Sequence, residues 1–485
     1  MPGPVRRWLP LALLIALPAA AADPFAALRA SLQRQLVEQQ VPSLAVAVAK
    51  DGKIIWEEGF GWADRENRVP ATAHTLYSLA SISKPITATG LMVLVERGLI
   101  DLDRPVNDYL GDAKLRARAG GPPATVRHVA NHSSGLPLHY QFFYEDEPYR
   151  PPPMDETIRR YGFLLTPPGE RYQYSNLGFG VLDYLLSRLS RKPYADFLRE
   201  EVFLPLGLTH TSVGLGPRLE KYAAVRYGPD SLPIPFYDFD HRGGSAIWSS
   251  AHDLVRFGLF HLKAHLADQK AILPDQTIDA MHRPTSAQSK GSGYGIGWAI
   301  DENQTYRTVS HNGSMGGVAT SLFLIPSERI AVAVLCNAGV SLPHRIRQEI
   351  ISALLPVQKA VPETKPTPPL SFRPPPELAG TWTGAVHTYK EELPFSLEIF
   401  ESGDVHAQLG GQMKTLLNDV TFRDNRLEGR FPGDIGTEDA NRRPYFLSLA
   451  LHLRGKLLNG GVSALSRPGR RAGNALTHWV ELSKQ

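Results

Sequence analysis

The amino-acid sequence predicts an α/β (α+β) domain followed by a smaller all-β domain. Runs of β-forming residues lie at both ends of the first 355 residues, with helical patterns between them. A proline-rich stretch then leads into a tail of short alternating runs. The chain has 485 residues, 42% hydrophobic and 21% charged, which suits a globular protein of two or three domains. We therefore expect a first domain over 23–355, a linker over 356–376 and an all-β domain over 377–485.

The first 22 residues are expected to be a cleavable signal peptide. The basic pair Arg6-Arg7 precedes an apolar run from Leu9 to Leu17, and the segment 1–22 ends in alanines. A signal anchor is the alternative, but the run is shorter than the roughly 20 apolar residues of a membrane helix, and no later run approaches that length. We expect an exported protein, periplasmic or secreted, with no membrane span after cleavage.

The first domain is expected to open with an amphipathic helix and a hairpin. Asp23 can cap the helix, and Pro24 suits its first position. Leucines recur every four residues, at Leu28, Leu32 and Leu36. Two β-type runs follow in SLAVAVAKDGKIIWEEGFG, joined by a glycine-containing turn at 50–52.

The end of the first domain is expected to complete the same sheet. A helical pattern covers 87–98, and far downstream VATSLFLI (318–325) and IAVAVLC (330–336) form a strand pair separated by PSER. Strands at both ends with helices between them predict one sheet assembled from distant segments.

The tail is expected to fold separately from the first domain. Eight prolines between positions 356 and 376 favour extended backbone and cannot sustain a helix or a central strand. Alternating runs such as FSLEIF, VTFRDNRLEGRF and THWVEL follow, punctuated by turn residues. They predict a small barrel or sandwich.

Charge and cysteine usage exclude two classes of protein. The net charge is +4, and loss of Arg6 and Arg7 with the signal leaves +2 by subtraction, so nucleic-acid binding is not expected. Cys336 is the sole cysteine, which rules out an internal disulfide. Its apolar surroundings predict a buried structural thiol.

A serine and a lysine lie three residues apart where the helical pattern begins, at Ser81 and Lys84. Near the start of a helix this spacing places both side chains on one face, and free N–H groups there favour an oxyanion. Lysine can act as the base for a serine only when burial or nearby cations keep it neutral. Alone, the pattern also fits a capping serine with a solvated lysine, but it occurs once in this sequence. Ser83, between them, is expected to point elsewhere and to pack or cap.

Two further motifs contain residue types that can take part in acyl transfer. Tyr174 and Asn176 form the sole Tyr-x-Asn, in which a phenol can shuttle a proton and an amide can orient a substrate carbonyl or the lysine. A packed tyrosine with a turn asparagine is the alternative. The third motif is His311-Asn312-Gly313, where the glycine leaves room for a ligand and Ser314 can offer its backbone N–H.

A second His-x-Gly occurs at 241–243. We prefer the triplet beginning at His311, because a glycine-rich strand edge surrounds it, whereas HRGGSAIWSSAHDL is typical of a turn that leads into a helix.

Together, in this order, the three motifs resemble those of the serine β-lactamase and penicillin-binding protein superfamily. The likeness is to the branch of class C β-lactamases, D-alanyl-D-alanine carboxypeptidases, D-aminopeptidases and esterases. Flanking segments are also similar, including VRHVANHSSGLP, GGSAIWSSAHDLVRF and GYGIGW, and the similarity covers roughly residues 25–350. It implies a β-lactamase/transpeptidase-like domain with an antiparallel sheet flanked by helices, and a barrel or lipocalin-like tail.

The resemblance also implies roles for single residues. Ser81 would be the acylated nucleophile, and Lys84 with Tyr174 would handle its proton. Asn176 would hold the substrate amide. The N–H groups of Ser81 and Ser314 would form the oxyanion hole. An α/β-hydrolase is not expected, since the sequence has no Gly-x-Ser-x-Gly elbow. No cofactor and no metal is expected, since it has neither His-Glu-x-x-His nor a Gly-x-x-x-x-Gly-Lys-Ser/Thr loop.

The third motif departs from the Lys-Thr-Gly of most β-lactamases. His311 replaces a lysine and Asn312 replaces a hydroxyl, the pair that usually engages a substrate carboxylate. This makes efficient β-lactam hydrolysis doubtful, although His-x-Gly also occurs in peptidase and esterase members.

We expect a serine hydrolase that acts on a small-molecule or peptide substrate, such as a D-residue cell-wall peptide or a small ester. A class C type β-lactamase and a non-hydrolytic penicillin-binding sensor are the alternatives. The tail would either shape the active-site entrance, as in related hydrolases, or be a passive domain. The sequence does not predict the oligomeric state.

Overall fold

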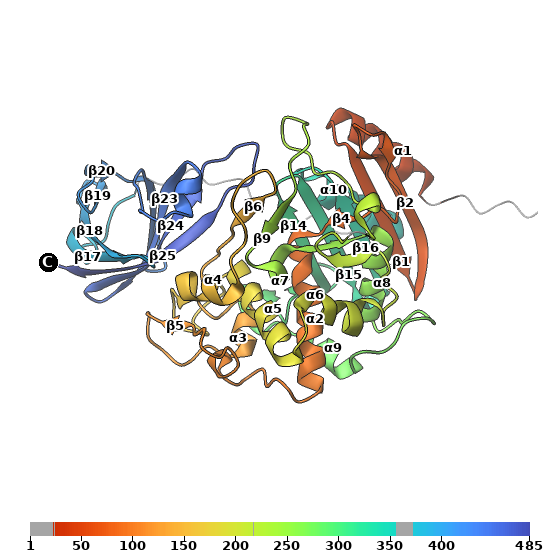
Figure 1. Ribbon diagram of the computed structural model, residues 1–485, viewed down its shortest axis with the longest axis horizontal. Coiled ribbons are helices and arrows are strands. Elements are labelled where there is room, and N and C mark those ends of the chain that lie inside the picture. The colour runs from red at the N-terminus through yellow and green to blue at the C-terminus, as the bar shows by residue number, and fades with distance from the viewer. Residues whose placement is uncertain (1–22, 24, 217, 356–371) are drawn as a thin grey trace, which may run out of the picture.

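The computed structural model describes residues 23, 25–216, 218–355 and 372–485 (Figure 1). The predicted signal peptide over 1–22 and most of the predicted linker over 356–376 lie outside the described residues. Helices and several β-sheets occupy the chain up to residue 354, and an all-β part follows from residue 380. The expected α+β class with a β-rich tail is confirmed.

The N-terminal helix α1 spans Ala26–Glu38 and buries the predicted leucine stripe of Leu28, Leu32 and Leu36. The helix begins later than the sequence suggested. Asp23 lies before its N-cap residue, Phe25, and Asp23 Oδ1 accepts a hydrogen bond from the Phe25 N–H at 2.9 Å.

The central sheet is antiparallel and joins both ends of the first domain. The predicted hairpin consists of β1 (Ser43–Lys50) and β2 (Lys53–Asp64), and the φ angles of 50° at Asp51 and 77° at Gly52 suit its tight turn. On its other side β1 pairs with β16 (Ile330–Cys336), so segments almost 300 residues apart are neighbours. In spatial order the nine strands found in the described residues are β11 (Ser286–Ser289), β12 (Ser292–Tyr294), β13 (Ala299–Asp301), β14 (Thr308–Met315), β15 (Val318–Ile325), β16, β1, β2 and β3 (Val69–Pro70).

Strand alternation gives this sheet two different faces. The alanines of β1, at 45, 47 and 49, face one core, which contains apolar residues of α2 (Ser83–Glu96) and α8 (Ala251–His261). The larger residues of β1, at 44, 46 and 48, face a second core with α1 and α10 (Leu342–Leu354). The sheet is therefore the middle of three layers (Figure 1). Cys336 is buried in the second core as predicted, and burial raises the pKa of its thiol to about 12.

The remaining helices pack around α2 on the first face of the sheet. They are α3 (Val126–Ala130), α4 (Met154–Tyr161), α5 (Asn176–Ser190), α6 (Tyr194–Leu198), α7 (Arg242–Ser245) and α9 (Asp275–Met281). Small sheets connect them, made of β4 (Tyr77–Ser78), β10 (Ile247–Ser249) and β8 (Thr211–Val213), of β5 (Arg116–Ala117) and β7 (Phe163–Leu164), and of β6 (Phe142–Tyr144) and β9 (Tyr237–Phe239). Among the described residues, none of the helices is both long and apolar enough to cross a membrane.

The tail forms one antiparallel sheet that curls into a nearly closed barrel. Of the two predicted forms, the barrel is therefore confirmed. In spatial order its nine described strands are β20 (Thr415–Leu416), β19 (Val405–Leu409), β18 (Glu392–Ile399), β17 (Gly380–His387), β25 (Ala475–Lys484), β24 (Leu457–Ser466), β23 (Tyr445–Arg454), β22 (Arg426–Phe431) and β21 (Asn418–Arg423). Alternate residues of β18 and β19 are buried, as expected for strands with one face inside a barrel.

The barrel contacts the first domain through the loop between β24 and β25, which reaches β6 and β9 (Figure 1). The backbones of Tyr140 and Ala475 exchange two hydrogen bonds, of 3.2 and 2.8 Å. Asn474 Oδ1 accepts a hydrogen bond from the Phe142 N–H at 3.0 Å. Outside this loop, Arg443, which precedes β23, donates two hydrogen bonds to the carboxylate of Glu147, at 3.0 and 2.7 Å. The contacts with Tyr140 and Phe142 hold the end of the loop beside the pockets described below.

Candidate active site

Ser81 lies in a single 3-10 turn, Ala80–Ile82, which leads directly into α2. The preceding Ala80 has a φ angle of +48°, a left-handed conformation that costs an alanine about 1 kcal/mol or more. The turn thus holds a strained backbone immediately before a partly exposed serine hydroxyl. Ser83 points elsewhere, as predicted, and its Oγ accepts a hydrogen bond from the Ile247 N–H at 3.1 Å.

Lys84 is completely buried beneath Ser81, with 0% of its surface exposed. Its Nζ lies 3.2 Å from Ser81 Oγ, 2.8 Å from Asn176 Oδ1 and 2.9 Å from the carbonyl oxygen of Gly244. The ring centroid of Tyr174 is 4.8 Å from the same nitrogen. The predicted pairing of Ser81 with Lys84 is therefore present in the structure.

The surroundings of Lys84 favour a neutral amine. Burial removes water from the Lys84 amine and holds its pKa well below that of a solvated lysine. Among the described residues, no carboxylate lies near enough to oppose this effect. A neutral amine has two N–H bonds and one lone pair. Asn176 Oδ1 and the Gly244 carbonyl can only accept hydrogen bonds, so they take both N–H groups. The lone pair is then left to face Ser81 Oγ.

Asn176 fixes the position of Lys84 from the first residue of α5. The N-cap of this helix is Ser175, whose Oγ accepts a hydrogen bond from the Gly178 N–H at 3.0 Å. Asn176 Nδ2 donates to the carbonyl oxygen of His139 at 3.0 Å, which directs Oδ1 toward the lysine. Of the two roles that the sequence suggested for this amide, orienting the lysine is visible in the geometry, and holding a substrate stays a prediction.

Tyr174 is half-buried beside Ser81 and Lys84. Burial raises the pKa of Tyr174, against the opposing effect of a hydrogen bond with Ser81. The phenol consequently keeps its proton at neutral pH. The ring of His132 packs 4.3 Å from that of Tyr174, and His132 Nδ1 accepts a hydrogen bond from the Ser175 N–H at 3.1 Å.

Gly313 allows β14 to pack directly against the turn that bears Ser81. A Cβ atom at Gly313 would lie 2.1 Å from the Leu79 carbonyl oxygen and 2.3 Å from Thr320 Oγ1. The sequence suggested that a ligand approaches this glycine, but in the structure its nearest neighbours belong to the chain itself. β13 ends opposite Ser310, so from His311 onward β14 has a strand partner on one side only. Its other edge, including Ser314, faces Ser81.

His311 is neutral at physiological pH. It is 6% exposed, and burial lowers the pKa of His311 to about 3. Nδ1 lies 2.8 Å from the Asn312 carbonyl oxygen and Nε2 lies 2.8 Å from the Tyr294 hydroxyl. Since a carbonyl only accepts, Nδ1 donates and Nε2 accepts from the phenol. The third motif therefore supplies no permanent positive charge.

Two pockets meet at Ser81. The first, of about 300 Å³, has aromatic side chains among its lining, including Tyr140, Phe142 and Phe239, and is completed by Ala472 and Gly473 of the β24–β25 loop. The second, called the polar pocket here, has a volume of about 330 Å³, is lined mostly by residue types that carry a polar group, and contains most of the predicted site residues. It is lined by Tyr172, Tyr174, Gln288, Tyr294, Ala299, His311, Asn312, Gly313, Ser314 and His344, besides Ser81. Asn176 lies in the first pocket, and Ser81 and Ser314 border both. All eight predicted site residues are thus gathered around one nucleophile.

Three features of the site escaped the sequence reasoning. His241, interpreted from sequence as part of a turn, is the N-cap residue of α7 and lines the aromatic pocket. Its Nδ1 lies 2.8 Å from Asp240, whose other carboxylate oxygen lies 2.8 Å from His139 Nε2. The His-x-Gly pattern was the available signal. The Gly244 carbonyl and the loop at 472–473 gave none, because any residue has a carbonyl and the loop is remote in sequence.

A buried lysine paired with a serine at a helix start, beside the edge of an antiparallel sheet, is the arrangement that the resemblance to the β-lactamase and penicillin-binding protein class predicted. The Beta-lactamase family model matches residues 28–354 of the sequence. The chain belongs to the β-lactamase family.

Curated relatives include proteins with different names. Penicillin-binding protein 4* of Bacillus subtilis is 27% identical over 60% of this chain and 67% of its own length. The unguisins hydrolase ungD' of Aspergillus campestris is 28% identical over 64% of this chain and 61% of its own. Protein flp of Staphylococcus aureus is 22% identical over 63% and 61%. The chain thus spans about two thirds or less of these relatives.

Solved structures show the same fold. The octameric penicillin-binding protein homologue from Pyrococcus abyssi aligns with a TM-score of 0.60 at 23% identity, over 93% of this chain and 99% of its own. A class C β-lactamase aligns with a TM-score of 0.59 at 19% identity, over 69% of this chain and 97% of its own. The first alignment extends well beyond the β-lactamase region of this chain, and the second is close to that region in extent.

Proposed function

We propose that the protein is an exported serine hydrolase that forms an acyl-enzyme on Ser81 with amide or ester substrates. Membership of the β-lactamase family supports acyl-transfer chemistry, since the family includes serine hydrolases. The observation that carries the proposal is the buried Lys84, whose two N–H groups are taken by Asn176 and Gly244 while its lone pair faces the serine. Export rests on the signal-like segment 1–22.

In the first step Ser81 loses its proton to Lys84. The Oγ–H bond breaks as Oγ bonds to the substrate carbonyl carbon, and the amine becomes an ammonium. The carbonyl oxygen takes the negative charge, next to the N–H groups of Ser81 and Ser314. The Ser81 N–H lies at the start of a helical turn and the Ser314 N–H on the open edge of β14, so both are suited to an oxyanion.

In the second step the bond to the leaving group breaks. The neutral phenol of Tyr174 donates its proton to the departing amine or alkoxide, and the Lys84 ammonium restores that proton, so both groups return to their starting state. Water then attacks the acyl carbon with Lys84 as base. Ser81 Oγ leaves with a proton, and a carboxylic acid is released.

The two pockets give some indication of the substrate. An apolar group fits the aromatic pocket, and hydrogen-bonding groups fit the pocket that contains the neutral His311. Without a fixed cation at the third motif, binding relies less on a substrate carboxylate than in β-lactamases with lysine there. Small esters and D-residue peptides therefore suit the site better than β-lactams.

Covalent labelling and a substrate panel test this proposal. A fluorophosphonate probe should modify Ser81, and Ser81→Ala should abolish labelling and turnover. Ser314→Ala is the matched control, because only the backbone N–H of Ser314 is used, so labelling should persist. Labelling that survives in Ser81→Ala would refute the proposal.

Turnover of a p-nitrophenyl ester, a D-alanyl anilide and nitrocefin should separate the possible activities. We expect the ester or the anilide to be the better substrate. Rapid nitrocefin hydrolysis alone would instead identify a class C type β-lactamase, and a penicillin adduct that persists for hours without turnover would identify a sensor.

A further inference from the structure

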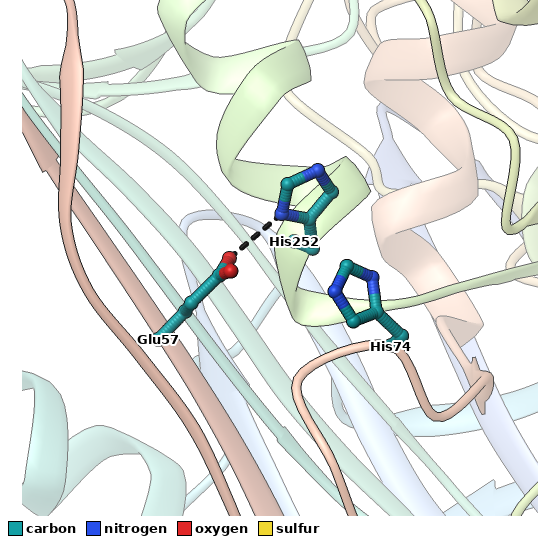
Figure 2. A group of neighbouring side chains, drawn as sticks. All are labelled: Glu57, His74 and His252. Carbon is teal, nitrogen blue, oxygen red and sulfur yellow. Dashed lines mark hydrogen bonds and ion pairs between the residues drawn. The ribbon is translucent and has the colours of Figure 1, made fainter.

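A group of potential metal ligands lies outside both pockets, on the side of the sheet covered by α8. Glu57 comes from β2, His74 from the loop between β3 and β4, and His252 from the first turn of α8. Figure 2 shows the carboxylate of Glu57 directed toward the two imidazole rings. His74 is exposed, whereas Glu57 and His252 are half-buried. Three elements distant in sequence thus direct donor atoms to one point that solvent can reach.

The donor atoms are close enough for one ion to collect. One ligand atom from each residue lies within 4.8 Å of the other two. Glu57 Oε2 is 2.7 Å from His252 Nδ1, and the rings of His74 and His252 are 4.6 Å apart. Zinc bonds nitrogen and oxygen at about 2.0–2.2 Å, which places tetrahedral ligand atoms about 3.4 Å apart. Binding therefore requires the Glu57 and His252 atoms to move apart from 2.7 Å, and the exposed ring of His74 can adjust its distance to them.

The ligand chemistry selects a class of ion. Two imidazole nitrogens and one carboxylate oxygen suit zinc and neighbouring transition metals, whereas magnesium and calcium prefer oxygen ligands. A surface ion pair would explain the contact between Glu57 and His252, but it gives no reason for a second imidazole beside them. The ring of His210 lies a further 5.4 Å from that of His74.

The other His and Asp cluster of the described residues is not equivalent. His139, Asp240 and His241 are fully buried, and both carboxylate oxygens of Asp240 already bond an imidazole. Both oxygens of Asp240 are therefore engaged without an ion, and all three residues are shielded from solvent. The Glu57 cluster has an open solvent side, as a hydrated metal requires.

We propose that Glu57, His74 and His252 bind one divalent transition-metal ion of the zinc type, with water completing its coordination. The ion joins β2, α8 and the segment that leads from His74 to Ser81. Ser81 lies seven residues after His74. His252 already contacts this segment, because its N–H donates to the Ala73 carbonyl oxygen at 3.1 Å. A bound ion stabilises the folded chain by mass action and takes no part in the acyl-transfer steps.

Calorimetric titration of the tag-free protein with Zn²⁺ tests the site. We expect one ion per chain, a rise in Tm on binding, and no comparable rise with Mg²⁺. His74→Ala should weaken binding by at least ~10-fold, and because His74 is exposed this variant should fold normally. Zn²⁺ binding to His74→Ala that is as tight as to the unmodified chain would overturn the proposal. So would the absence of saturable binding to the unmodified chain at submillimolar Zn²⁺.

A matched control is available in the barrel. His387 and Glu392 form a similar surface pair, with His387 Nδ1 2.9 Å from Glu392, but they lie in no three-ligand group of the described residues. His387→Ala should leave Zn²⁺ binding intact. Ser81→Ala should also bind Zn²⁺ normally, which keeps this test independent of the proposed hydrolase activity.

Discussion

The two pockets that meet at Ser81 are built differently. The polar pocket lies entirely within the first domain, where residues such as Tyr174, in the loop before α5, and His311, on β14, surround Ser81. The aromatic pocket is completed by Ala472 and Gly473, which come from the barrel and lie almost four hundred residues after Ser81 in the sequence. Acyl-transfer chemistry therefore depends on the first domain, while the space available to one side of the substrate depends on both.

This difference separates rate from selectivity. Changes around Lys84 and Tyr174 should lower turnover of every substrate, because these residues act on the nucleophile and the leaving group. Changes at the barrel loop should affect substrates according to their size. The following substitutions probe this contrast, from the largest expected effect to the smallest.

Lys84→Met should give the largest loss. Methionine fills the buried space but has no basic lone pair. Loss of general-base catalysis lowers kcat/KM by roughly 10²–10⁴-fold. We expect a loss near the upper end of this range, because the same nitrogen serves both steps. Steady-state assays with ester and amide substrates measure this. Lys84→Arg is the informative control, since arginine introduces a permanent charge and stays protonated at neutral pH, so it cannot accept the serine proton. An active arginine variant would contradict the role of a neutral amine.

Tyr174→Phe should lower turnover less, and unequally. The phenol protonates the leaving group, so amide hydrolysis should fall by roughly 10²-fold or more. A p-nitrophenyl ester releases a stable anion that needs no proton, and its acylation should change far less. Comparison of kcat/KM for both substrates gives the ratio. Equal losses on the two would argue against proton donation by Tyr174.

Gly313→Ala should displace the nucleophile without altering its chemistry. The added Cβ would lie 2.1 Å from the backbone oxygen of Leu79, so β14 or the Ser81 turn has to shift, and a 1 Å misplacement can cost about 10²-fold in rate. Rates and Tm should be measured together. Gly339→Ala, whose Cβ would meet its nearest neighbour at 3.8 Å, should leave both unchanged.

Ala472→Trp should have the smallest effect on rate and the clearest effect on selectivity. A larger side chain fills part of the aromatic pocket, so kcat/KM for esters with a bulky acyl group should fall by about 10-fold or more, while that for acetate esters stays near normal. A uniform loss would mean that the barrel loop supports the catalytic residues rather than the substrate.

The residues proposed to react are easier to predict from the sequence than the surrounding groups that set their chemistry. Ser81, Lys84 and Tyr174 have characteristic spacings. Apolar β-type runs at both ends of the first domain predict its sheet, and alternating runs predict the tail. The start of α1 at Ala26 was missed because one capping residue cannot fix a helix end.

The remaining parts of the site depend on tertiary contacts. The Gly244 carbonyl, which takes one N–H of Lys84, is a backbone group without a sequence signature. The sequence around His241 is typical of a turn that leads into a helix, and only folding shows that this residue shares a pocket with Ser81. The neutrality of His311 follows from its burial beside Tyr294, which no local pattern encodes.

The pH dependence of Ser81 labelling tests the central claim most directly. A neutral Lys84 must accept the serine proton, so the rate of fluorophosphonate labelling should be low in acid and rise as pH passes the pKa of Lys84, which burial holds well below that of a solvated lysine. The rise should disappear in Lys84→Met. A labelling rate that rises only when the pH reaches the pKa of an ordinary lysine would contradict the account. So would a pH profile of the labelling rate that is the same in Lys84→Met.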